Sequence, residues 1–248
     1  MKAGLLIIDV QNDFGEKGAL PIKGSEEILP IINNIRSTYD KKFASVFLTQ
    51  QYRPPTHIAF TTSPYAKEEN LPFDKVTLAA KGKFPPHNIG GTPGANFMTE
   101  MLIKGDEILI RKDEDKFTEE LSSWTSKLLR EIVKTNEINT MFVCGLTYDF
   151  SVGLTAIDIA NSSKGKIKVY VIKDACKAYA EASEKAMDVN LEKTGCKLIT
   201  FKEFEDIIKD VADARDATGG IAQENAKVEE AKHLAEKEKT EEKPEEKK

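Results

Sequence analysis

Apolar, largely β-branched runs recur along the chain, and most of them are continuous rather than alternating. Continuous runs of this kind are typical of parallel strands whose two faces are both covered by helices. The runs predict six strands, which span residues 3–10, 44–50, 107–111, 140–146, 168–173 and 196–201.

The segments between these runs carry apolar residues at helical spacings of three and four. They predict helices, the first of which begins after Gly24 with Ser25 as its N-cap. The predicted helices span residues 25–39, 121–135, 149–162, 181–194 and 202–216. This alternation of strands and helices predicts an α/β fold, a three-layer αβα sandwich around a mostly parallel six-stranded sheet.

One long segment, residues 51–101, departs from the alternation because it is rich in proline and glycine and shows little periodicity. Irregular stretches of this length within a compact domain are usually functional. The segment follows the carboxyl end of the second predicted strand, where open α/β sheets place their ligand sites. We therefore expect it to contribute to a binding site; the alternative is an elaborated surface connection.

The C-terminal end of the chain differs from the rest in composition. The chain has 248 residues, a net charge of −5 and 31% charged residues. Lysine and glutamate supply 16 of the 30 residues from 219 to 248, and such low hydrophobicity is typical of a disordered or marginally helical segment. The sequence thus predicts one globular domain over residues 1–218 and a charged tail over residues 219–248. The tail either stays solvated or becomes ordered on a protein partner.

Several classes of protein are excluded by the same composition. The mild acidity argues against a nucleic-acid binder, and no apolar run approaches the ~20 residues that cross a bilayer. The N-terminal segment, MKAGLLIIDV, is typical of a first strand rather than a signal peptide. The three cysteines, Cys144, Cys176 and Cys196, have neither disulfide nor metal-ligand spacing, which suits a reducing compartment. We expect a cytoplasmic protein without membrane or nucleic-acid contacts. The sequence does not decide whether the chain forms homo-oligomers.

Four motifs fall at predicted strand ends or in the irregular segment. They read IIDVQNDF, QQYRPPTH, FPPHNIGGTPGA and VCGLTYDFSV, and they begin at residues 7, 50, 84 and 143. Together with Lys112, after the third predicted strand, they resemble the isochorismatase-like hydrolase superfamily, most closely its nicotinamidase branch. The resemblance covers about residues 1–210 and implies the same α/β fold and an amide-hydrolase activity.

The resemblance implies a catalytic group made of Asp9, Lys112 and Ser151, in which Ser151 stands where the family has its nucleophilic cysteine. The alternative for the Asp9–Lys112 pair is a structural ion pair at the edge of the sheet. In the family, backbone amides around a cis peptide form the oxyanion hole. The matching amides here are those of Thr147 and Ser151, and the matching cis bond joins Leu146 to Thr147.

Two aromatic residues, Phe14 and Phe84, match the positions that flank a flat substrate ring in this family. The alternative interpretation is that both are ordinary aromatic residues of the hydrophobic core. Ring contacts of this kind would accept nicotinamide or a similar planar substrate, so the resemblance implies a substrate-binding role for both residues.

The nucleophile position departs from the family pattern. A helix N-terminus lowers the pKa of a thiol enough to form a thiolate, but a serine hydroxyl at the same place stays protonated. Ser151 would therefore need a strong neighbouring base, such as the histidine of a serine hydrolase. Asp9 is a weaker base, and His233 lies far away in the tail. Cys144 is no substitute, because it lies within an apolar strand and is predicted to be a core residue.

The metal site that the resemblance implies is also altered. Gln51 replaces a carboxylate ligand and Arg53 replaces an imidazole, while His57 and His87 remain at ligand positions. A guanidinium offers no lone pair and repels a cation, and two histidines alone rarely hold zinc. The sequence therefore predicts a vestigial metal site and no cofactor. Gln51, Arg53 and Lys112 could instead bind a small anionic ligand.

Three hypotheses follow. In the first, the protein is a pseudoenzyme that acts as a structural or binding component of an assembly. In the second, it is an active hydrolase that uses Ser151 on an amide such as nicotinamide. In the third, it is a metal-free, isochorismatase-like hydrolase or binder of an anionic small molecule. The first is the preferred hypothesis, because nucleophile and metal ligands are altered together and a charged tail is added.

Overall fold

A computed structural model of the chain, described here for residues 1–67 and 80–215, contains one six-stranded sheet in which every neighbouring pair of strands is parallel. The strand order is β3-β2-β1-β4-β5-β6. The strands are β1 Ala3–Ile8, β2 Phe43–Gln51, β3 Ile108–Lys112, β4 Thr140–Leu146, β5 Lys168–Lys177 and β6 Lys197–Ile199. All six strands match the predicted runs to within a few residues.

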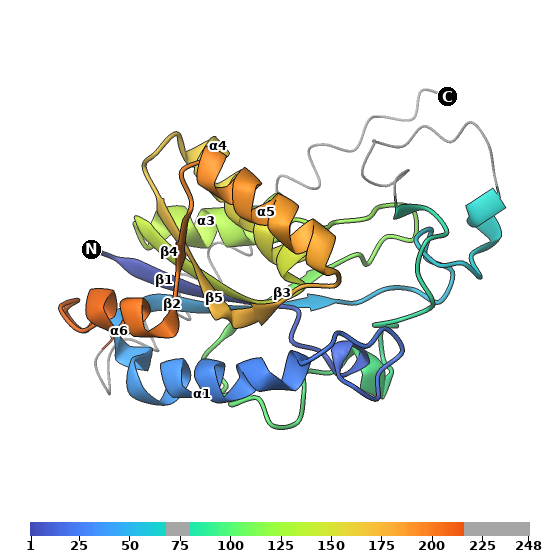
Figure 1. Cartoon of the computed structure of the whole chain (residues 1–248), viewed down its shortest axis with the longest axis horizontal. Helices are drawn as coiled ribbons and strands as arrows, with labels where there is room; N and C mark the ends of the chain where they lie inside the picture. The colour runs from blue at the N-terminus through green and yellow to red at the C-terminus, as the bar shows by residue number, and fades with distance from the viewer. Residues whose placement is uncertain (68–79, 216–248) are drawn as a thin grey trace, which may run out of the picture.

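Helices cover both faces of the sheet, as Figure 1 shows. Helices α1 and α6 lie on one face, and α3, α4 and α5 lie on the other. The helices are α1 Leu29–Thr38, α3 Lys127–Thr135, α4 Gly153–Ser163, α5 Glu181–Lys193 and α6 Phe201–Ile208. The three-layer αβα sandwich predicted from the sequence is therefore confirmed.

Burial of the strands explains why their sequences are so apolar. Every residue of the central strands β1 and β4 is buried, whereas the edge strand β3 alternates between buried and exposed positions. Close packing of β1 on β4 requires Gly145, because a Cβ at this position would lie 2.2 Å from the Ile8 carbonyl oxygen. This tight contact brings the carboxyl ends of the two central strands together.

Four helix boundaries differ from the prediction. Helix α3 begins at Lys127 rather than at residue 121, and α4 begins at Gly153 rather than at residue 149, because a π-helical turn precedes it. Ser25 does not cap an α-helix; it begins a 3₁₀ turn, Ser25–Ile28, and its hydroxyl donates to Glu26. Helix α6 ends at Ile208 rather than extending to residue 216. The chain leaves the helix so that the buried Arg215 can donate to the Phe43 carbonyl and pair with Asp106. Tertiary contacts therefore override the local helical spacing.

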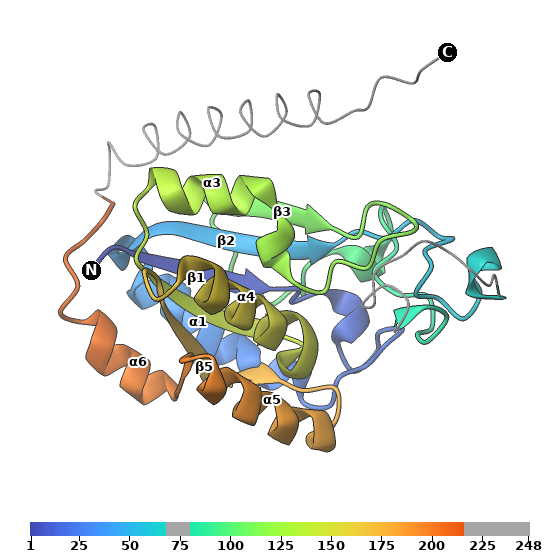
Figure 2. The ribbon, with the colours of Figure 1, turned by 90° about the horizontal axis from the view of Figure 1, so that it is seen from above.

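The carboxyl ends of the strands face the irregular part of the molecule (Figure 2). The strand order reverses between β1 and β4, and such a reversal is where open α/β sheets form ligand sites. The described part of the predicted irregular segment contains two short 3₁₀ turns, Pro64–Lys67 and Pro93–Ala95, and isolated bridges such as the one between Arg53 and Ile89. The tail, residues 219–248, lies outside the described residues, so the domain boundary at residue 218 stays a prediction. No helix among the described residues is long and apolar enough to span a membrane.

Candidate active site

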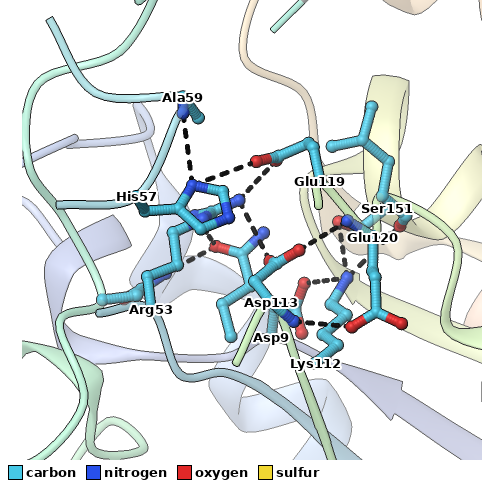
Figure 3. Close-up of polar contacts among 12 residues, drawn as sticks. Asp9, Arg53, His57, Ala59, Lys112, Asp113, Glu119, Glu120 and Ser151 are labelled. Atoms are coloured by element: carbon cyan, nitrogen blue, oxygen red, sulfur yellow. Dashed lines mark hydrogen bonds and ion pairs between the residues drawn. The ribbon is translucent and has the colours of Figure 1, made fainter. Parts of the chain in front are cut away.

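The side chains of Asp9, Lys112 and Ser151 meet beyond the central strands (Figure 3). Lys112 Nζ lies 2.8 Å from Asp9 Oδ2 and donates to Ser151 Oγ at 3.1 Å. It also donates to the Leu121 carbonyl at 3.2 Å. All three side chains are almost completely buried. The structure thus brings together the three residues that the sequence predicts as the catalytic group.

The parallel strands account for this convergence. Asp9 follows β1 directly, and its carboxylate accepts a 2.6 Å hydrogen bond from Thr49 Oγ1 on β2. The register of β2 against β3 pairs Gln51 with Lys112 at the ends of both strands. Adjacent parallel strands that end together place their last side chains at one edge of the sheet, so the two charged groups face each other there.

Ser151 reaches the site from the other side of the strand reversal. It lies in a turn of π-helical geometry, Tyr148–Val152, that joins β4 to α4. The peptide bond between Leu146 and Thr147, just before this turn, is cis, as the resemblance implies. The turn places the Ser151 hydroxyl opposite Lys112 at the amino-terminal end of α4.

Arg53 is almost completely enclosed, with 1% of its surface exposed. Its Nη1 donates to Gln51 Oε1 and to His87 Nε2, both at 2.7 Å. Its Nη2 donates to Glu119 Oε1 at 2.5 Å and lies 3.1 Å from Asp113 Oδ2. The residue that the sequence suggests as a free anion-binding group therefore has both terminal nitrogens engaged within the protein.

The two histidines adopt neutral forms that their partners define. His87 Nδ1 lies 2.8 Å from the Pro85 carbonyl oxygen, which can only accept, so Nδ1 carries the hydrogen and donates it. The other ring nitrogen, Nε2, therefore has a lone pair, and this lone pair faces Arg53. His57 donates from Nε2 to the Thr118 carbonyl at 2.9 Å. Burial, together with the charge of Arg53, lowers the pKa of both imidazoles. Both rings are therefore neutral at physiological pH.

Two acidic residues of the site, Asp113 and Glu119, were missed by the sequence reasoning. They lie in the loop after β3, where Asp113 Oδ1 accepts from the Glu120 backbone amide at 2.6 Å. Burial raises the pKa of Glu119 to about 7, although Arg53 opposes the rise. The sequence did contain a signal for these two residues. A buried arginine requires a carboxylate partner, and the loop after the third predicted strand is rich in acidic residues.

A narrow pocket lies in front of Ser151, and about 30 Å³ of free space remains in it. This is roughly the share of one water molecule in the liquid. The other predicted residues that line the pocket are Phe14, Gln51, Arg53, Phe84, His87 and Thr147. Phe150 and Tyr179, which the sequence reasoning did not identify, also contribute to the lining. An aromatic ligand would require these side chains to move.

Asp149 fixes one wall of this pocket. Its carboxylate accepts from the backbone amides of Tyr179 at 2.8 Å and Ala180 at 3.1 Å, and from Ser183 Oγ at 2.5 Å. These bonds tie the Ser151 turn to the start of α5.

A doubly wound parallel sheet with an Asp–Lys–Ser cluster at its strand reversal defines a protein with a hydrolase fold. The chain belongs to the isochorismatase domain family, which matches residues 3–203. A nicotinamidase of Acinetobacter baylyi is 32% identical over 182 residues, which cover 70% of this chain and 80% of that protein.

Solved structures show the same relationship. A nicotinamidase/pyrazinamidase of Acinetobacter baumanii shares 28% sequence identity and a TM-score of 0.70, over 82% of this chain and 98% of that one. The pyrazinamidase of Pyrococcus horikoshii, in complex with zinc, shares 25% identity and a TM-score of 0.67, over 81% and 99% of the two chains. The chain is therefore similar to nicotinamidases and pyrazinamidases over nearly their whole length.

The zinc in that pyrazinamidase raises the question of whether a metal fits this chain. His57, Asp113 and Glu119 offer ligand atoms that lie within 4.8 Å of one another. Arg53 Nη2, however, contacts both carboxylates, and a guanidinium keeps its positive charge in a protein. A divalent ion on these ligands would lie beside that fixed charge, so the residues present do not fit a metal while Arg53 holds this position.

Proposed function

We propose that this chain is a nicotinamidase-like protein without amide-hydrolase activity that serves as a structural or binding component of an assembly. The observation that carries the proposal is the hydrogen bond from Lys112 to Ser151. An ammonium paired with Asp9 has no lone pair that could accept the serine proton. A serine nucleophile needs a base within hydrogen-bond reach, and both described histidines bond to other groups.

The proposal includes the absence of a bound divalent metal. It is supported by the two contacts of Arg53 with the site's carboxylates. The small volume of the pocket also favours a closed, non-catalytic site. In this interpretation Gln51, Arg53 and His87 form a hydrogen-bonded wall instead of a set of metal ligands.

The assembly role is supported by the charged tail over residues 219–248, which lies beyond the family match. We propose that this tail contacts a protein partner in the cytoplasm. Its mixed charge and low hydrophobicity suit a segment that gains order on binding.

A second candidate is a working amide hydrolase, and one observation favours it. Ser151 lies at the amino-terminal end of α4 and in contact with Lys112, and serine–lysine pairs do act as nucleophile and base in some hydrolases. This chemistry would require Lys112 to lose its proton despite its pairing with Asp9. The names of the relatives suggest nicotinamide as its substrate.

The third candidate, a metal-free hydrolase or binder of a small anion, has less support. Arg53 Nη1 and Nη2 and Lys112 Nζ all contact protein acceptors. An anion would have to displace some of these partners before it could bind either cation. Such a ligand stays a prediction.

A small fluorophosphonate tests the proposal without knowledge of the substrate, because it labels activated serines. We expect no adduct at Ser151 by peptide mass spectrometry. An adduct at Ser151 that disappears in Ser151→Ala would contradict the proposal and favour the hydrolase.

The matched control is Ser151→Cys, treated with iodoacetamide. A thiol beside Lys112 at a helix N-terminus should be a thiolate and should react readily, which demonstrates access to the position. The wild-type background should be low, because Cys144, Cys176 and Cys196 are all buried and burial raises the pKa of each thiol.

A further inference from the structure

A groove of about 640 Å³ lies between helices α3 and α4, close to the amino ends of strands β4 and β5. Its floor is made of buried or partly buried apolar residues, Trp124, Val133, Ile138 and Ile167. Its rim is basic and is made of Arg130, Lys134, Lys164 and Lys166. The one acidic residue of the lining, Glu137, pairs with Lys2 at 2.5 Å. These residues define the α3–α4 groove, which combines an apolar floor with an excess of positive charge at its rim.

The helix ends at this groove argue against a small anion as its occupant. Helices α3 and α4 end here, at Thr135 and Ser163, and the carboxyl end of a helix carries a partial negative charge. That charge disfavours an anion on the groove floor. Lys164 and Lys166, by contrast, are exposed at the rim. The groove therefore suits a peptide that places apolar side chains on the floor and carboxylates at the rim.

The tail of the same chain has both of these features. Residues 224–238 carry five glutamates and three lysines, whereas residues 239–248 carry four of each. The net negative charge of the tail therefore lies in the first of these two stretches. The same stretch holds apolar residues at spacings of three and four, which would share one side of a helix. They are Val228, Ala231, Leu234 and Ala235.

The described part of the chain also ends near the groove. Arg215, its last residue, donates from Nε to the carbonyl of Phe43 at the start of β2. The starts of β2, β1 and β4 lie side by side, so two strand spacings, about 10 Å, separate Phe43 from Thr140 at the start of β4. The eight residues that follow Arg215 can span up to ~26 Å when extended. Residue 224 is thus within reach of the groove.

We propose that residues 224–238 dock in the α3–α4 groove of their own chain, with Val228 and Leu234 on the apolar floor and glutamates beside Lys164 and Lys166. The covalent tether gives the segment a high effective concentration at the groove, which favours docking even though each surface ion pair contributes little. The inference goes beyond the proposed function, because a protein partner of the tail would have to compete with the groove. It does not depend on the reactivity of Ser151.

Carbodiimide cross-linking of the full chain tests the contact, because this reagent joins a lysine to a carboxylate that it already touches. We expect peptide mass spectrometry to find links from Lys164 or Lys166 to Glu229 or Glu230. An equal mixture of unlabelled and isotopically labelled protein separates links within one chain from links between two copies. Absence of these links overturns the proposal. Links found only between labelled and unlabelled chains also overturn it, since they place the tail on a second copy.

Hydrogen exchange of the full chain measures how firmly the segment is held. In the wild type, the amides of residues 224–238 should exchange more slowly than those of residues 239–248. Lys164→Glu combined with Lys166→Glu should reduce this protection by about 10-fold, the effect expected from the loss of two surface ion pairs. Added salt should reduce the protection as well, because it screens contacts between exposed charges.

Two further variants show whether the effect belongs to the groove. Adding Glu229→Lys and Glu230→Lys to the double groove variant exchanges the charges of the two sides and should restore the protection. Lys185→Glu combined with Lys202→Glu is the matched control, because both lysines are exposed on other helices and neither lines the groove. This control should leave the protection of residues 224–238 unchanged.

The outcomes separate this proposal from the proposed function. Equal exchange rates along the whole tail of the wild type overturn the docking, and so does protection that the double groove variant retains in full. Either result leaves the proposed absence of amide-hydrolase activity intact. Amide hydrolysis that depends on Ser151 would overturn the proposed function and leave the docking unaffected.

Discussion

Lys112→Met should lower the free energy of unfolding by about 3–5 kcal/mol, the usual range when one partner of a buried ion pair is removed. The variant leaves the fully buried Asp9 carboxylate without a counter-charge. Oδ2 of Asp9 has no hydrogen-bond partner, so the ion pair with Lys112 is its main stabilising contact. Urea unfolding followed by circular dichroism measures the effect.

Two variants serve as controls for this prediction. Lys185→Met removes an exposed partner of Glu181 and should change stability little, because surface ion pairs contribute weakly. Adding Asp9→Asn to Lys112→Met should restore part of the lost stability, since no uncompensated charge remains. If Lys112→Met were as stable as Lys185→Met, the buried ion pair would not have the role assigned to it.

Arg53→Met should have an effect of similar size, also about 3–5 kcal/mol, because it leaves two buried carboxylates without a cation. The loss should depend on pH. Burial already raises the pKa of Glu119 to about 7 from an ordinary value of 4.5, and Arg53 opposes that rise. Without Arg53 the pKa of Glu119 should rise further.

The sign of the pH dependence follows from proton binding. A carboxylate whose pKa is higher in the folded than in the unfolded chain holds more protons in the folded state between the two values. Stability is therefore lost as the pH rises through that window. Below about pH 7 both proteins keep the Glu119 proton in the folded state and should lose stability in parallel as the pH rises. Above about pH 7 the wild type has released this proton, whereas Arg53→Met should still hold it and continue to lose stability, so the two curves should diverge there. Curves that stay parallel above this pH would show that removal of Arg53 does not raise the pKa of Glu119.

Much of the fold could be predicted from the sequence, because its parallel strands are continuous apolar runs. The two central strands are buried along their whole length, so no polar face obscured their pattern. The end of α6 could not be predicted in this way. The helical spacing continues past Ile208, and it is the contacts of Arg215 with β2 and its surroundings that end the helix.

The predicted site residues came from the resemblance, and strand geometry explains why they converge. Lys112 is the last residue of β3, Asp9 follows β1, and Ser151 lies in the turn after β4; parallel strands bring such residues to one edge. The partners of Arg53 were not predictable in the same way. Glu119 lies in a loop whose acidic sequence is typical of a solvent-exposed surface. Only the tertiary fold shows that the Glu119 side chain is buried against the guanidinium of Arg53.

This contact also changes how the altered motif is interpreted. From the sequence, Gln51 and Arg53 looked like lost ligands or a new anion site. In the structure they bond to each other, and Arg53 also bonds to His87. The replaced positions therefore form a self-contained network rather than an open site.

Ammonia release from nicotinamide tests the central claim most directly. The assay would compare the purified wild-type chain, with and without added zinc, with Ser151→Ala. We predict that both proteins give the same background rate under both conditions. Ammonia release by the wild type that is abolished in Ser151→Ala would contradict the claim and identify the chain as a working hydrolase.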